Sequence, residues 1–503
     1  MYSHSEDQIE FYHFIHPFGG KLEEENRWVQ LSKLIPWLEL EESYKKHFSA
    51  DRGAPAKSAR MAYGSLIIQE KCKFVDEELI YQIRENPYLQ FFIGFKEYQK
   101  TAPLDSSTLV DFRKRISVKD VQVLIENMLK NHGLVDDKSD LDQKDLRTHQ
   151  GQLLIDASCA PADITFPTDL KLLNHSRELT EEVIDILYEK GGKKEKKPRT
   201  YRKKARKEFL KIIRRKKTPK AMLRTANQTQ LSFVQRNLRH IDKLSQSCCL
   251  RGIPKVLYKK LLVISEVARQ QAWMLENPGS VEGRIVNLSQ PHIRPIVRAK
   301  AGAKTEFGAK ISLSVHNGFS FLHRVCFDNY NEGGDLIAQA EYYKSLHGFY
   351  PESIHADKIY RNRENLSYCR DKEIRLSGPA LGRPSKDLVK NKAQKALIRK
   401  DEGIRNGVEG KFGQAKRRFT LGKVMGKLAN TSSTKIAFSI LVLNLEKLLL
   451  FYFSQLFSML VLKKIGNFFS INRLNTWKKL NVKNILKPSF VFLPRLNQNL
   501  LCF

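Results

Sequence analysis

The stretch "GAKISLSVHNGFSFLHRVCFDN", residues 308–329, consists of two alternating runs of apolar and polar residues joined by His316-Asn317-Gly318. Alternation with a period of two is typical of a strand with one buried face. Asn-Gly between two such runs is the strongest short signal for a β-hairpin. We therefore predict an antiparallel hairpin here, with a larger sheet built around it.

Apolar segments on both sides of this hairpin supply further strands. "GQLLIDAS", residues 151–158, is a short apolar run that ends in Asp156 and suits a strand in the centre of a sheet. "ESIHADKIY", residues 352–360, carries Asp357 near the end of another apolar run. Two more elements are expected after the hairpin, a helix near residues 334–347 and a short strand at "KEIRLSG", residues 372–378.

Length and composition indicate a large protein that binds a polyanion. The chain has 503 residues, enough for about three domains at roughly 150 residues each. It carries 87 Lys and Arg against 54 Asp and Glu, a formal charge of +33, and nucleic acid is the commonest partner of so basic a protein. Its seven cysteines are an odd, scattered set without a C-x-x-C pair, which argues against a disulfide scaffold and a zinc site.

The N-terminal part is predicted to be helical. After an N-terminal segment at 1–55, residues 56–133 show apolar positions at helical spacing, and "DSSTLVDFRKRI" at 105–116 has a helix-start signal. Several short helices in a basic protein are compatible with a helix-turn-helix DNA-binding domain, and equally with plain helical packing. A polar stretch at 134–150 is expected to be a linker.

A basic helical insertion is expected at about residues 186–276, between the first strand and the hairpin. Residues 190–220 hold 17 Lys or Arg against two acids, Glu195 and Glu208. Such a run is often a solvated surface or a disordered arm. Like charges at this density repel one another unless a polyanion neutralises them, which favours contact with nucleic acid.

Neither end of the chain predicts secretion or a membrane protein. The first 14 residues, "MYSHSEDQIEFYHF", contain early acids and no apolar core of a signal peptide, so we expect a cytoplasmic protein. The apolar run at 448–462 has 15 residues, whereas a membrane span needs roughly 20. A buried helix is the favoured interpretation, and a membrane segment is the alternative.

A third acid lies in "DEGIRNGVEGKFGQAKRRF", residues 401–419. At about 100° per residue, Arg405, Glu409 and Lys416 fall within roughly 40° of one another on one helix face. An ordinary exposed Arg–Glu pair would have the same spacing. The segment also contains three glycines, each costing a helix about 1 kcal/mol, which suggests that a sheet or a DNA strand approaches the backbone closely.

Together these acids indicate phosphodiester chemistry. Asp357 alone could simply cap the helix that follows it. Asp156 and Asp357 at the ends of two buried strands, with Glu409 on a later helix, would instead suit two divalent cations, which prefer oxygen ligands. Two such ions can stabilise both the attacking and the leaving oxygen of a phosphoryl transfer.

Three of these segments together resemble a known family. "LLIDAS", "HADKIY" and "RNGVEGKFGQAKRRF" are similar to the catalytic segments of the DDE transposases of bacterial insertion sequences. The last resembles the family signature Y-x2-R-x3-E-x6-K at Arg405, Glu409 and Lys416 and departs from it at Glu402, where the signature has tyrosine. "DSSTLVDFRKRI" is similar to a helical N-terminal segment of the same group, so the resemblance covers about residues 55–450.

The resemblance implies a fold and a domain order. It implies an α/β protein with an RNase H-like, mixed-sheet catalytic domain at 151–450, which contains the basic helical insertion. An all-helical DNA-binding domain at 56–133 is expected to precede it, and a helical, basic tail at 451–503 to follow it.

The resemblance also implies the site. Asp156, Asp357 and Glu409 become the catalytic residues and the ligands of Mg²⁺, with two ions expected and Mn²⁺ as a substitute. Arg405 and Lys416 become contacts to the phosphates of the element's end. Two neighbouring basic residues, Lys411 and Arg417, are expected to contact DNA as well.

The function expected from this resemblance is transposition. The enzyme would cleave at the ends of its own element and join the 3′-OH ends to target DNA. Its partner would be double-stranded DNA, held by a homodimer in the bacterial nucleoid, with no membrane and no small-molecule substrate. Two rivals are a metal-dependent nuclease on the same fold and an inactive, DNA-binding repressor derived from a transposase.

Overall fold

The structure is a computed structural model of the 503-residue chain. The chain divides into two compact units, Met1–Lys447 and Leu448–Phe503, and the elements below belong to the first unless stated otherwise. The predicted linker at 134–150 lies almost entirely outside the described part. The structure describes residues 10–16, 19–49, 53, 55–135, 149–191, 196–247, 249–277, 279, 281–297, 305–379 and 388–469.

Helices make up the N-terminal part as far as residue 131. Trp28 and Trp37 both pack edge-on against Phe92, with ring centroids 5.2 and 5.6 Å apart. Helices on both sides of residue 56 therefore share one core. The elements are η1 (Phe11–His13), α1 (Arg27–Lys33), α2 (Trp37–Lys45), α3 (Ala59–Cys72), α4 (Asp76–Glu85), α5 (Pro87–Phe92), α6 (Ser106–Arg115) and α7 (Val118–Asn131).

The helix-start signal in the sequence is confirmed at α6. This helix begins directly after Asp105, and its apolar residues Leu109 and Phe112 are buried. The next helix, α7, begins with a capping box, in which Ser117 and Asp120 each accept a hydrogen bond from the other's backbone N–H.

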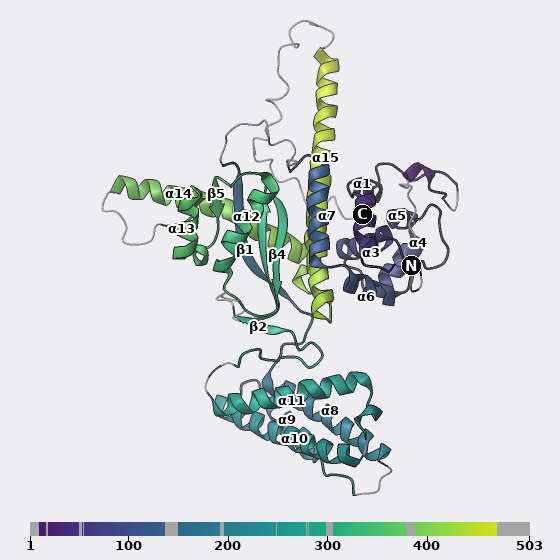
Figure 1. Ribbon diagram of the computed structural model, residues 1–503, viewed down its shortest axis with the longest axis vertical. Coiled ribbons are helices and arrows are strands. Elements are labelled where there is room, and N and C mark those ends of the chain that lie inside the picture. The colour runs from purple at the N-terminus through teal and green to yellow at the C-terminus, as the bar shows by residue number, and fades with distance from the viewer. Residues whose placement is uncertain are drawn as a thin grey trace. The chain divides into compact units, whose positions relative to one another are not determined.

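Six described strands form one mixed sheet with β1 at its centre (Figure 1). β1 pairs antiparallel with β3 on one side and parallel with β5 on the other, and β6 extends the parallel side. The second edge of β3 pairs with both β4 and β2. The strands are β1 (Gln152–Pro161), β2 (Arg294–Val297), β3 (Thr305–His316), β4 (Phe319–Cys326), β5 (Ser353–His355) and β6 (Arg375–Leu376).

The predicted hairpin is confirmed in β3 and β4. Asn317 and Gly318 form its turn, with φ angles of 50° and 78°. Two consecutive residues with positive φ are the mark of a type I′ turn, whose twist matches that of the flanking strands. The predicted central strand is confirmed as β1.

One face of the sheet packs against α12 (Leu336–His347). Leu153 and Ile155 of β1 and Ile354 of β5 point to this face and are completely buried with Leu336 of α12. The helix expected at 334–347 therefore exists and covers the sheet. α13 (Arg363–Asp371) follows β5, and four short turns of 3-10 helix complete the region, η4 (Glu332–Asp335), η5 (Lys358–Tyr360), η6 (Thr420–Gly422) and, in the insertion, η3 (Leu250–Gly252).

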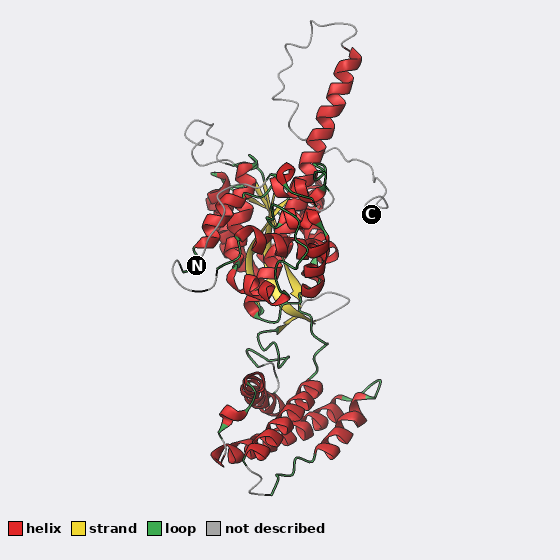
Figure 2. Ribbon diagram, turned by 90° about the vertical axis from the view of Figure 1, so that its right-hand side faces the viewer, coloured by secondary structure: helices red, strands yellow, loops and turns green. Residues whose placement is uncertain are grey.

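The insertion between β1 and β2 is helical, as Figure 2 shows in red, and has its own hydrophobic core. Leu173, Val234 and Ile264 come from three different helices of this core and are almost completely buried. The helical part begins at Asp169, earlier than the sequence indicated, because the first helix is long. The helices are α8 (Asp169–Lys190), α9 (Arg202–Ile213), α10 (Lys220–Ser247) and α11 (Lys255–Glu276).

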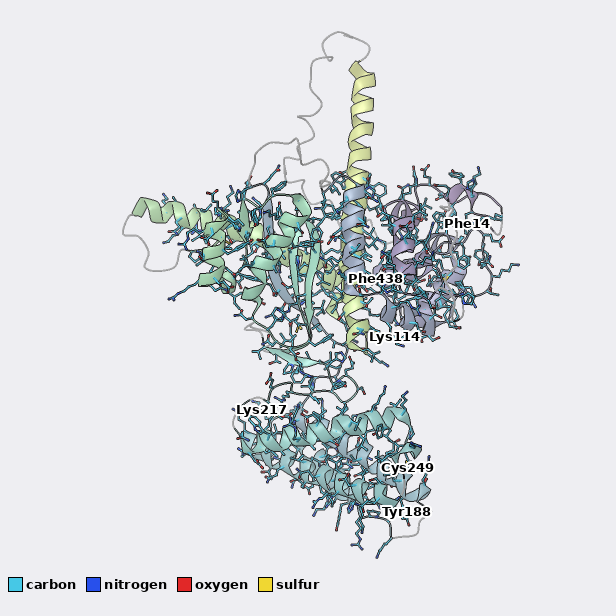
Figure 3. All side chains as sticks on the ribbon, in the orientation of Figure 1. Phe14, Lys114, Tyr188, Lys217, Cys249 and Phe438 are labelled. Atoms are coloured by element: carbon cyan, nitrogen blue, oxygen red, sulfur yellow. The ribbon has the colours of Figure 1, made fainter. Side chains whose placement is uncertain are left out.

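Two long helices, α14 (Leu388–Arg418) and α15 (Ala429–Phe469), end the described chain. Phe438 of α15, labelled in Figure 3, contacts Tyr63 of α3 with ring centroids 5.7 Å apart. The buried carboxylate of Glu70 in α3 accepts hydrogen bonds from Thr420 and from Ser439 of α15. These contacts join the N-terminal helices to the C-terminal part of the first unit.

One helix in the described part is long and apolar enough to cross a membrane, namely α15 over Ala429–Ser454. Most of its most apolar window, 61%, is buried inside the protein, as in the core helices of soluble proteins. The expected buried helix at 448–462 is buried at Leu448, but Leu450 and Phe453 are 63% and 44% exposed. The expectation is wrong for these exposed positions, and the side chains beyond residue 454 lie outside the described part.

Candidate active site

Asp156 and Asp357 belong to neighbouring segments of the sheet. β1 and β5 are parallel and pair Leu154 with His355, and the ladder ends there. Asp156 follows Leu154 by two residues within β1, so these two share the face opposite α12. Asp357 follows His355 by two residues and lies beyond the end of β5, at the start of η5.

Asp357 is exposed just beyond the end of β5 and also caps the turn that follows. Its Oδ1 accepts a hydrogen bond of 2.7 Å from the backbone N–H of Lys358. The capping interpretation of this residue is thus confirmed. A carboxylate has two oxygens with several lone pairs, so this cap leaves capacity for a cation.

Helix α14 crosses the same face of the sheet. A Cβ at Gly407 would lie only 3.0 Å from Cδ2 of Leu154, so this glycine allows the close approach that the sequence indicated. Val408 and Phe412 are buried beside it. A Cβ at Gly410 would meet nothing within 4 Å, so the backbone there is open to a large ligand.

Glu409 lies on α14 but is paired with a cation of its own helix. Its carboxylate is 3.1 Å from the Arg405 guanidinium, and the two side chains are 53% and 23% exposed. Among the described residues, no three His, Cys, Asp or Glu side chains are close enough to hold a metal ion. The structure therefore places Asp156 on β1, Asp357 just after the neighbouring β5, and Glu409 in an ion pair on α14.

The other basic residues of α14 point in different directions. Lys411 is about 240° around the helix from Arg405, and burial lowers the pKa of its ammonium group. Its charge also helps to lower the pKa of Lys447 to about 7, after the larger effect of burial. Lys416 is half-buried, and Arg417 is exposed with its Nε donating to the Gly413 carbonyl at 3.3 Å.

The basic run of the insertion presents most of its charge to solvent. On α9, Ala205 is buried, whereas Lys203, Lys204 and Lys207 are exposed. Lys217 lies in the turn between α9 and α10 and is exposed too (Figure 3). Two cations of the run share one acid, because Asp185 pairs with Lys197 at 2.8 Å and with Arg202 at 2.9 Å.

Sequence reasoning missed an ion pair that joins a buried acid of α14 to β6. Asp401 is only 4% exposed and pairs through both oxygens with Arg375 of β6. Asp401 is spaced seven residues from Val408 and fourteen from Ala415, both completely buried. That spacing places the acid on the buried face of the helix, so the sequence pattern could have identified Asp401 as a buried acid.

Two family models match the chain, one in the region of α14 and one in the N-terminal helices. A model described as "Transposase DDE domain" matches residues 354–446, which include Asp357, α14 and Glu409. A model described as "Transposase domain (DUF772)" matches residues 16–115 in the N-terminal helices. Together the two matches support an insertion-sequence DDE transposase. The first match begins after β1, so the assignment of Asp156 depends on the pairing of β1 with β5.

A curated relative adds a shorter similarity. A protein of Rhizobium meliloti described as "Uncharacterized protein ORF8 in nfe locus" is 36% identical over 98 residues, which are 20% of this chain and 47% of that protein. The chain thus spans about half the length of this relative. No solved structure matches the chain.

Proposed function

We propose that this transposase cleaves DNA at the ends of its element and joins the resulting 3′-OH ends to target DNA. The observation that supports the proposal is the parallel pairing of β1, which carries Asp156, with β5, which leads to Asp357, together with the contact of α14 with β1 at Gly407 and Leu154. Each step replaces one P–O bond by another, first with water and then with the 3′-OH as nucleophile. One site can perform both steps because the two nucleophiles are chemically alike.

The carboxylates of Asp156, Asp357 and Glu409 would hold the divalent cations that DDE domains generally use, here Mg²⁺ or Mn²⁺. Carboxylate oxygens are the ligands these ions prefer, and Asp357 and Glu409 are open to solvent. A bound pair of ions would stabilise negative charge on the attacking and leaving oxygens. Glu409 would first exchange the Arg405 guanidinium for the cation.

The strand order supports an RNase H-like catalytic domain. An antiparallel hairpin beside a central strand, followed by two parallel strands on the other side, is the order that such a domain requires. Asp156 lies on β1 and Asp357 directly follows β5, the two strands in the middle of this order. The long helical insertion leaves this sheet intact, because it begins after β1 and ends before β2.

Positively charged groups of this chain would position the DNA. Arg405 and Lys416 lie on the face of α14 that carries Glu409, so a strand gripped by them would pass beside the carboxylates. Lys411 and Arg417 would add charge from other faces of the same helix. The exposed lysines of the insertion would hold DNA regardless of sequence, and the N-terminal helices at 56–133 would contribute to binding the element ends.

The whole enzyme would act in the bacterial cytoplasm, on the nucleoid, as a homodimer that pairs the two ends of the element. Pairing of two ends requires two active sites, and two copies of this chain supply them. Most of the tail expected at 451–503 lies outside the described residues, which end at Phe469.

A cleavage and joining reaction tests the proposal. The purified chain is incubated with Mg²⁺, DNA that carries the two element ends, and a target plasmid. We expect new 3′-OH ends at the element boundary and joined products in the plasmid. Cleaved ends without joined products would indicate the nuclease, and stable binding without cleavage would indicate the repressor.

A further inference from the structure

An ion pair between a buried acid and a partly exposed arginine ties α14 to the edge of the sheet. The side chain of Asp401 accepts from Nη1 of Arg375 at 2.8 Å and from Nη2 at 2.9 Å. Two parallel hydrogen bonds between a guanidinium and a carboxylate fix the direction of both groups as well as their distance. Arg375 belongs to β6, so this contact fixes one point of α14 against the sheet.

The same carboxylate lies against the strand that leads to Asp357. His355 is completely buried in β5, and its Nδ1 is 3.5 Å from Oδ1 of Asp401. On the other side of the ring, Nε2 is within hydrogen-bond distance of the Ser353 hydroxyl, at 3.0 Å. Asp401 is thus in contact with two strands, one of which leads two residues later to Asp357.

A second contact fixes α14 further along its axis. Gly407 lies against Leu154, which precedes Asp156 by two residues on the same face of β1. Glu409 follows Asp401 by eight residues, about 12 Å at 1.5 Å per residue. Because a helix moves as a stiff rod, a slip by one residue at Asp401 would shift Glu409 by about 1.5 Å and turn it by about 100°.

We propose that Asp401 is a positioning residue: paired with Arg375, it holds α14 in its register against β5 and β6 and so sets where Glu409 lies relative to Asp156 and Asp357. The inference rests on the proposed function and deepens it. The pair lies two turns from Glu409 along α14. An ion pair with a partly exposed arginine contributes little net stability, and a role in geometry accounts for its presence.

A double substitution separates positioning from stability. Replacing both partners, Arg375→Leu/Asp401→Leu, removes the directional contact without leaving a buried charge unpaired. Arg375→Lys keeps one positive charge and removes the paired hydrogen bonds. The matched control is Arg324→Leu/Asp335→Leu, an ion pair of 3.2 Å in which a half-exposed arginine of β4 meets a partly buried acid at the start of α12.

Three quantities are measured for each protein. The first is the Mg²⁺ concentration for half-maximal cleavage, the second is the affinity of the DNA-free protein for Mn²⁺ by electron paramagnetic resonance, and the third is the affinity for end DNA. For Arg375→Leu/Asp401→Leu we expect the Mg²⁺ concentration for half-maximal cleavage to rise, and the affinity for Mn²⁺ to fall, by about tenfold or more, as for residues that orient metal ligands. Arg375→Lys should lie between this variant and the wild type, and end binding should stay within about twofold because the phosphate contacts remain.

The outcomes distinguish this inference from the function on which it rests. Unchanged Mg²⁺ and Mn²⁺ dependence in a folded Arg375→Leu/Asp401→Leu protein overturns the positioning role and leaves the transposase untouched. An equal loss in the Arg324→Leu/Asp335→Leu control also overturns it, because the effect would then be general. A wild-type protein that neither binds Mn²⁺ nor cleaves DNA overturns the proposed function and this inference with it.

Discussion

The two faces of the central sheet carry different kinds of polar group. Towards α12, β1 and β5 present Leu153, Ile155 and Ile354, and the Ser314 hydroxyl is within hydrogen-bond distance of His316 and His323. Towards α14, β1 presents Leu154 and Asp156, and Asp357 follows the end of β5 by two residues. We expect one face to serve stability and the other the reaction, so substitutions on the two faces should have different consequences.

The largest effect is expected from substituting the three acids. Ile155, the neighbour of Asp156 on the opposite face of β1, provides the comparison. Asp156→Ala, Asp357→Ala or Glu409→Ala should each lower cleavage by about a thousandfold or more with end binding nearly intact, because these residues act on the reaction and affinity depends mostly on phosphate contacts. Ile155→Ala should instead cost about 2–5 kcal/mol of stability, with the activity of the folded fraction retained. Cleavage rates measure the activity, filter binding measures the affinity for end DNA, and urea unfolding measures the stability. Strong residual cleavage by Glu409→Ala would remove that residue from the site.

A smaller effect is expected on the α14 side from its two cations. Lys416→Ala should weaken end binding and strand joining together, by roughly tenfold, if Lys416 grips a backbone phosphate. Arg405 is 3.1 Å from Glu409, so its loss could act on the carboxylate instead. Titrating Mg²⁺ against each variant separates the two roles. Rescue of Arg405→Ala by excess Mg²⁺ would reject the phosphate contact for Arg405 and keep it for Lys416.

The insertion should affect binding without regard to DNA sequence. Lys203→Gln, Lys204→Gln and Lys207→Gln remove three exposed charges from α9. Each phosphate that the protein no longer neutralises reduces the slope of log affinity against log salt by about 0.9, so the slope of the triple variant should fall by up to roughly 2.7. Lys255→Gln/Lys259→Gln on α11, outside the basic run, is the control. A slope equal to that of the wild type would mean that the run is only solvated.

The smallest effect concerns the α12 face, where a chain of neutral histidines is buried. The Ser314 hydroxyl lies 2.8 Å from His316 Nε2 and 2.7 Å from His323 Nε2, and Tyr342 and Tyr343 of α12 pack on these rings. Burial lowers the pKa of His323 to about 4, and burial with the neighbouring His347 and His323 lowers that of His316 well below its usual value.

These histidines bind protons more readily in the unfolded protein than in the folded one. The free energy of unfolding should therefore be largest above about pH 6.5 and fall as the pH drops towards about 4. His323→Phe removes one such group and should flatten the fall, measured as urea midpoints at several pH values. Equal pH dependence in both proteins would contradict the neutral, buried state of His323.

The sequence predicted the parts of this arrangement that depend on local patterns. Asn317-Gly318 specified the hairpin because few residues tolerate two positive φ angles in succession. The apolar runs before Asp156 and Asp357 specified two buried strands, and their pairing followed once both strands lay in one sheet. The three glycines on α14 predicted a close neighbour, which at Gly407 is the sheet.

Contacts between distant segments could not be predicted in the same way. Arg375 and Asp401 are 26 residues apart, and nothing local marks them as partners. The short edge strand β2 has only four residues and no clear alternation. The pairing of Glu409 with Arg405 follows from helical spacing, yet the same spacing fits a contact with DNA, so the sequence left both interpretations open.

The central claim is that the sheet face beneath α14 holds the reacting site. Iron-directed cleavage of the protein backbone tests it most directly: Fe²⁺ replaces Mg²⁺, ascorbate and peroxide generate hydroxyl radicals at the bound ion, and mass spectrometry locates the cuts. We predict cuts next to Asp156, Asp357 and Glu409, all suppressed by excess Mg²⁺ and absent in Asp156→Ala. Cuts confined to other segments, or cuts near these residues that Mg²⁺ does not suppress, would contradict the account.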